Sequence, residues 1–130
     1  KEIQVFSKEC PLFVPFVEEG MVEGEAINLI VEHYLSSFKN NIDTMILGCT
    51  HYPLLKPVIK DFVKDINLVD SASAIATHAK NILIKKNLMN EVVNSNKLEC
   101  FVTDLPRKFE KLGKIFLGET INQPQLVNDF

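Results

Sequence analysis

A short apolar run, residues 45–47, ends at Gly48 and is followed at once by a thiol, a hydroxyl and an imidazole in residues 49–51. Beyond them, apolar side chains recur at helical spacing through residues 54–63. A buried strand that passes through a glycine into a helix is typical of open α/β sheets, which bind ligands at the carboxyl ends of their strands. The sequence therefore predicts an α/β fold with a site at Cys49.

The residues around Cys49 favour a chemical role for its thiol. Pro53 suits the first turn of the predicted helix, where its missing N–H costs nothing. Cys49 would then lie just ahead of a helix N-terminus, whose partial positive charge favours thiolate over thiol. His51, two residues further on, can support proton transfer. The alternative is that Cys49 is a small buried hydrophobe, as most free cysteines are.

The remainder of the chain alternates between strand and helix patterns. We expect the strand at residues 44–47 to be covered on both faces of a parallel sheet, because it is continuously apolar. Either Asp70 or Ser71 can cap the helix that follows the strand at residues 66–69. The asparagine-rich residues 87–96 are predicted to form a loop. The other expected elements are strands at residues 3–7, 98–102 and 125–127, a helix at residues 24–38, and a short helix from Pro106 to near Gly113.

Composition excludes several classes of function. A net charge of −3 offers no basic surface for nucleic acid or for an anionic membrane, and no apolar run is long enough to span a bilayer. The three cysteines, Cys10, Cys49 and Cys100, are an odd number and widely spaced, which favours reduced thiols in a cytoplasmic protein. Among the cysteines and histidines no pair has zinc-ligand spacing, so no metal is expected.

Three ordered segments carry a resemblance to a known family. Gly-Cys-Thr-His-Tyr-Pro-Leu at residues 48–54 resembles the second cysteine motif of bacterial glutamate racemases, and residues 10–20 and 69–72 resemble two further blocks of that family. The resemblance implies a three-layer α/β fold with a mainly parallel sheet, within a two-domain racemase architecture. Residues 1–69 would form most of the second domain, and residues 70–130 would return to complete a first domain. Because the chain begins with lysine and matches only the second half of the family, we expect a piece of a longer protein.

The resemblance also implies an activity: cofactor-independent interconversion of L- and D-glutamate by two cysteines, which supplies D-glutamate for peptidoglycan. Inverting an α-carbon requires an acid/base group on each face, and a cysteine serves in both directions near neutral pH. Cys49 matches the second cysteine, His51 a histidine that assists it, and Thr50 a residue that holds a substrate carboxylate. Glu18 matches an acidic residue near the substrate ammonium, although Glu19 is adjacent and the register between them stays open.

The first cysteine of the family has no counterpart here, because Cys10 and Cys100 lie in unlike contexts. We expect both to be buried without function, and we expect the chain alone to be inactive. One alternative is a non-catalytic carboxylate-binding or self-associating α/β module. Another is aspartate racemase, whose similar motif usually carries glutamate where His51 stands.

The resemblance leaves one face of the chain without its usual partners. Its apolar side chains should therefore be covered by a compact rearrangement within the chain or by a homodimer, because large exposed apolar patches are rare. The residues concerned are Ile75, Ala79, Leu83 and Phe109.

Overall fold

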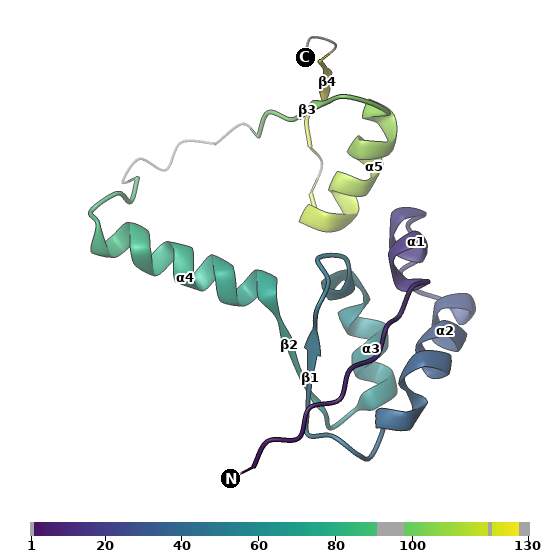
Figure 1. The fold of residues 1–130 in the computed structure, drawn as a ribbon. Coiled ribbons are helices and arrows are strands. Elements are labelled where there is room, and N and C mark those ends of the chain that lie inside the picture. The colour runs from purple at the N-terminus through teal and green to yellow at the C-terminus, as the bar shows by residue number, and fades with distance from the viewer. Residues whose placement is uncertain (1, 91–97, 120, 128–130) are drawn as a thin grey trace. The chain divides into compact units, whose positions relative to one another are not determined.

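The computed structural model describes residues 2–90, 98–119 and 121–127 (Figure 1). The chain divides into two compact units, Lys1–Lys80 and Asn81–Phe130. These units do not test the division at residues 69 and 70 between two racemase domains, which stays a prediction. The elements are α1 (Phe13–Glu18), α2 (Glu25–Leu35), η1 (Ser36–Phe38), β1 (Thr44–Leu47), η2 (Tyr52–Leu55), α3 (Lys56–Val63), β2 (Asn67–Asp70), α4 (Ser71–Lys85), β3 (Phe101–Val102), α5 (Pro106–Leu117) and β4 (Gln125–Leu126).

Strands β1 and β2 of the first unit form a parallel pair that places the carboxyl ends of both strands at one edge. Thr44 pairs with Asn67 at one end of the register, and Leu47 pairs with Asp70 at the other. The predicted strands at residues 44–47 and 66–69 are thus confirmed to within one residue. An α/β fold with a parallel sheet is confirmed as well.

The core of the first unit lies among α1, α2, α3 and one face of the sheet (Figure 1). The helical stripe predicted in residues 24–38 is confirmed, since Ile27 and Val31 of α2 are fully buried. Leu55 of η2 and Ile59 of α3 are also fully buried and belong to the same core as Ile27 and Val31. Burial of apolar side chains of this size contributes about 1.5–3 kcal/mol each, so this core holds the helices against the sheet.

The expectation that the strand at residues 44–47 is covered on both faces is wrong. Met45 and Leu47 pack into the core, but Ile46 points the other way and is 73% exposed. Val69 of β2 is likewise exposed. Alternate side chains of a strand point to opposite faces, and the core helices cover only one of those faces here.

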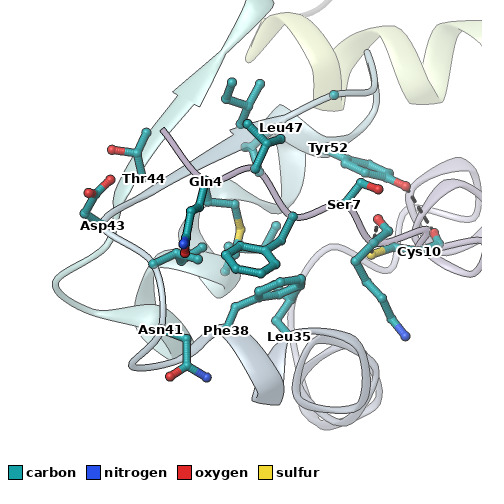
Figure 2. A pocket seen from close by; sticks show the side chains of 18 of the residues that line it. Gln4, Ser7, Cys10, Leu35, Phe38, Asn41, Asp43, Thr44, Leu47 and Tyr52 are labelled. Carbon is teal, nitrogen blue, oxygen red and sulfur yellow. Dashed lines mark hydrogen bonds between the residues drawn. The ribbon is translucent and has the colours of Figure 1, made fainter. Parts of the chain in front are cut away.

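The expected strand at residues 3–7 is also wrong. Residues 2–9 have no regular structure, and Ile3 and Val5 are exposed. Alternating apolar residues form a strand only where a sheet edge supplies hydrogen-bond partners and cover. Here a cavity of about 1170 Å³ lies between this segment and the stretch that contains β1 (Figure 2).

The second unit contains a parallel pair of very short strands, in which Phe101 pairs with Gln125 and β3 precedes α5. The predicted strand at residues 98–102 is thus shortened to its last two residues. The predicted short helix continues to Leu117, beyond Gly113. A Cβ atom at Gly113 would lie 2.5 Å from the Cδ1 atom of Ile121, so glycine serves close packing here and does not end the helix. Gly118, with φ of +71°, ends it instead.

Helix α4 starts where predicted, because the Oδ1 atom of Asp70 accepts a hydrogen bond of 2.9 Å from the backbone N–H of Ser73. Its expected core face is nevertheless exposed, with Ile75 at 65% and Leu83 at 41%. Phe109 of α5 is exposed too. Cover of these side chains by a rearrangement within the chain or by a homodimer stays a prediction. The predicted loop at residues 87–96 lies largely outside the described residues, which omit residues 91–97.

Candidate functional site

The site is built on the turn of residues 48–51, at the carboxyl end of β1. The backbone N–H of Tyr52 donates to the carbonyl of Cys49 at 3.2 Å, and that of Leu54 donates to the carbonyl of His51 at 3.1 Å. These bonds lead the chain from the turn into η2, where Pro53 occupies the first turn as predicted. The buried side chain of Leu55 then anchors η2 to the core.

The turn brings the predicted thiol, hydroxyl and imidazole together. The Sγ atom of Cys49 lies 3.9 Å from the Nδ1 atom of His51, and the Oγ1 atom of Thr50 lies 3.3 Å from the same nitrogen. Cys49 and His51 are half-buried, whereas Thr50 is exposed. The sulfur therefore lies beside a polar, solvent-reached group and is not enclosed by apolar side chains.

Glu18, at the end of α1, lies on the other side of the imidazole. Its Oε1 atom is 3.6 Å from the Nε2 atom of His51, which is ion-pair distance when the imidazole is protonated. The contact depends on packing between distant parts of the sequence, because the ring of Phe13 in α1 meets the ring of Tyr52 edge-on at 5.2 Å between centroids. Sequence reasoning placed Glu18 at the site but missed its contact with His51.

The order Glu18, His51, Cys49 has a consequence for the imidazole protons. A carboxylate beside Nε2 favours a proton on that nitrogen, which leaves Nδ1 as the acceptor in neutral imidazole. Nδ1 then faces two possible donors, the hydroxyl of Thr50 and the thiol of Cys49. The arrangement can take a proton from the sulfur and return it, which is what a reversible acid/base group needs.

Tyr52 is a neighbour of the site that sequence reasoning missed. Its hydroxyl donates a hydrogen bond of 3.2 Å to the backbone carbonyl of Cys10, tying the segment before α1 to η2. Burial raises the pKa of the Tyr52 hydroxyl, and negative charge on the nearby sulfurs of Cys10 and Cys49 raises it further. Tyr52 therefore stays a neutral hydrogen-bond donor and not a base. Its aromatic ring and motif position were the available signals.

The other cysteines and histidines lie in different surroundings. Cys10 is 4% exposed, and burial raises the pKa of its thiol, as expected of a buried residue without a chemical role. Cys100 is half-buried in the second unit. His33 and His78 are exposed on their helices.

Within the part of the chain that the structure describes, no three His, Cys, Asp or Glu side chains are grouped to hold a metal ion. None of the helices in those ranges is long and apolar enough to cross a membrane.

Curated relatives share this sequence over nearly its whole length. Glutamate racemase of Aquifex aeolicus is 47% identical over 126 residues, which are 97% of this chain and 46% of the relative. Glutamate racemase of Aquifex pyrophilus is 51% identical over 114 residues, 88% of this chain and 42% of the relative. No protein-family model matches the chain.

The same family appears among solved structures. The crystal structure of glutamate racemase from Francisella tularensis in complex with D-glutamate matches with a TM-score of 0.82 at 35% identity, over 97% of this chain and 48% of that one. The chain belongs to the glutamate racemase family. It spans about half the length of the curated relatives it matches. The family and the α/β fold that the resemblance implied are therefore confirmed.

Proposed function

We propose that this chain carries one of the two acid/base groups of a glutamate racemase, and that this group is the thiol of Cys49. The observation that carries the proposal is the order of three side chains, Cys49, His51 and Glu18, at the carboxyl end of β1. Open α/β sheets bind their ligands at that edge. The D-glutamate complex of the Francisella relative supports glutamate as the ligand.

In the proposed reaction the Cys49 thiolate removes the α-proton of L-glutamate. An S–H bond forms, the C–H bond breaks, and its electron pair is delocalised into the substrate carboxylate. A second acid/base group then delivers a proton to the opposite face, which gives D-glutamate. In the reverse direction the Cys49 thiol reprotonates the carbanion. His51 resets the sulfur between turnovers by taking its proton at Nδ1 or returning one.

Thr50 and Glu18 have the proposed task of binding substrate. The exposed Thr50 hydroxyl, beside Nδ1 of His51, can donate to a substrate carboxylate. Glu18 is half-exposed, so one carboxylate can face both His51 and the substrate ammonium. Its contact with His51 favours Glu18 over Glu19 as the site carboxylate. Two carboxylate oxygens with several lone pairs make this double role chemically possible.

The proposed reaction needs no group beyond protein side chains and substrate. It requires no cofactor, because each proposed step is a proton transfer between the substrate and an acid/base side chain. We place the parent protein in the bacterial cytoplasm, where D-glutamate would be used for peptidoglycan. Residues 1–69 would form most of one racemase domain, and residues 70–130 would belong to the other.

The second acid/base group is not assigned to either remaining cysteine. Cys10 is buried, and Cys100 lies in a sequence context unlike that of the family's first cysteine. We therefore expect this chain alone not to racemise glutamate. The test is exchange of the α-proton of L- and D-glutamate in deuterated water, followed by proton NMR, with Cys49→Ala as the control. Exchange from L-glutamate alone that disappears in the control supports Cys49 as its base. Exchange from both enantiomers, or exchange that persists in the control, contradicts the assignment.

A separate test distinguishes glutamate from aspartate as the substrate, because aspartate racemases carry a similar cysteine motif. Bound substrate should shield the Cys49 thiol from alkylation. We expect L-glutamate to slow labelling of Cys49 more than L-aspartate does, with labelling of Cys100 as the internal reference. Stronger protection by aspartate would favour the alternative.

Self-association is the second candidate role. Helix α4 is exposed along its whole length, and Ile46 and Val69 leave one sheet face uncovered. Exposed apolar surface of this kind favours an interface. Sedimentation velocity should show a dimer that Ile75→Asp disrupts. A monomer over a wide concentration range would exclude this role.

A further inference from the structure

Asp70 is the buried carboxylate at the end of β2, and its side chain is fully engaged. The residue is 6% exposed. Its Oδ2 atom accepts a hydrogen bond of 2.9 Å from the Nζ atom of Lys56, the first residue of α3. Its Oδ1 atom accepts the bond from the Ser73 backbone N–H, and the Ser73 hydroxyl lies 3.4 Å from Oδ2. Capping of α4 explains Ser73 but not Lys56, which belongs to a different helix.

The contact with Lys56 makes Asp70 meet both ends of the segment that carries Cys49. The backbone of Asp70 pairs with Leu47, the last residue of β1 before the turn. Its side chain holds Lys56, the first residue after η2. Between these two fixed points lie residues 48–55, with the thiol and the imidazole. Asp70 thus contacts the residue before this segment and the residue after it.

We infer that Asp70 and Lys56 are positioning residues, which hold the turn of residues 48–51 so that the Cys49 thiol lies beside the His51 imidazole. Among the described residues, the side-chain hydrogen bonds and ion pairs of Asp70 and Lys56 go to each other and to Ser73, and none goes to the Cys49 sulfur, so the effect passes through the backbone of the segment. Proton transfer between two side chains depends steeply on their separation, and a small displacement is enough to weaken it. The inference rests on the proposed function for the importance of Cys49 and His51, whereas their juxtaposition can be measured without turnover.

The experiment measures the rate of iodoacetamide labelling at each cysteine of the full chain, resolved by peptide mass spectrometry. The variants are Asp70→Asn, Lys56→Met, Lys56→Arg and His51→Gln, together with the double variant Asp70→Asn/His51→Gln. Arginine keeps the charge and the donors of Lys56, so it is the conservative control. Labelling of buried Cys10 reports unfolding, and labelling of half-buried Cys100 reports reagent activity.

We expect Asp70→Asn and Lys56→Met each to slow labelling of Cys49 by about three- to tenfold, the scale of coupling between residues in one network. Lys56→Arg should keep the rate within about twofold of the unchanged chain, because it restores the bridge. In the His51→Gln background, Asp70→Asn should have little further effect, since the contact that it supports is already gone. Labelling of Cys10 and Cys100 should not change.

Other outcomes would overturn the inference. If Asp70 and Lys56 acted on the sulfur directly through their charges, Asp70→Asn and Lys56→Met would change the labelling rate of Cys49 in opposite directions. A general loss of stability would raise labelling of Cys10 together with any change at Cys49. Unchanged or faster labelling of Cys49 in Lys56→Met, a variant at a half-exposed surface position, would also refute a positioning role. Because labelling does not require racemisation, failure of the proposed activity would leave these results unaffected.

Discussion

The Nε2 atom of His51 lies 3.6 Å from the Oε1 atom of Glu18, which joins the turn after β1 to the end of α1. The opposite ring nitrogen faces the sulfur of Cys49 at 3.9 Å. A carboxylate at this place holds the ring and its proton on the side away from the thiol, so that Nδ1 is presented to the sulfur. Glu18 therefore affects Cys49 through His51.

Replacing Glu18 by glutamine should slow alkylation of Cys49, because the amide holds the imidazole less firmly and does not favour a proton on Nε2. The expected change is about three- to tenfold, the scale of one supporting contact. Glu19→Gln is the matched control, since it removes the same charge one residue away. Equal effects of the two variants would mean that only the local charge matters.

The carboxyl of Asp70 should make the free energy of unfolding depend on pH in the acid range. Hydrogen bonds from the Ser73 backbone and from Lys56 lower its pKa from the ordinary 3.8 to about 2. A depressed pKa in the folded state stabilises the protein above the unfolded pKa, and this contribution is lost as the pH falls through the folded one. The unchanged chain should thus be more stable than Asp70→Asn at neutral pH in urea unfolding.

That stability difference should shrink as the pH falls from about 4 to about 2, where the native carboxyl also becomes protonated. A difference between Asp70→Asn and the unchanged chain that stays constant over this range would contradict the charge-based account.

Two isoleucines should contribute very differently to the free energy of unfolding, because one is buried and the other is exposed. Ile59 of α3 is fully buried, whereas Ile75 of α4 is 65% exposed. Ile59→Ala should lower the free energy of unfolding by about 2–5 kcal/mol, because it leaves a cavity. Ile75→Ala should change it by less than about 0.5 kcal/mol. Similar losses in both variants would show that α4 is covered in solution.

Local sequence patterns were sufficient for much of the first unit. The stripe of α2, the strands beside Cys49 and the cap of α4 each depend on residues that are neighbours along the chain or on one helix face. The same holds for the turn of residues 48–51, where adjacent residues bring thiol, hydroxyl and imidazole to one nitrogen. Such features are determined over short distances, so a single sequence carries them.

The features that the sequence did not predict depend on which other element packs against a given strand or side chain. Residues 3–7 have the alternation of a strand but do not pair, and Ile46 is apolar yet exposed, because periodicity does not say which faces will be covered. The contacts of Glu18 with His51 and of Asp70 with Lys56 join separate elements. No spacing in the sequence predicts contacts of this kind.

The central claim is that the Cys49 sulfur owes its reactivity to His51. Cys100 is the matched comparison, since it is also half-buried but belongs to the other unit. The most direct measurement is the ratio of alkylation rates of Cys49 and Cys100 in one sample, for the unchanged chain and for His51→Gln. The account predicts a ratio of about ten or more that falls severalfold when His51 is replaced. A ratio near one, or a ratio that His51→Gln leaves unchanged, would contradict it.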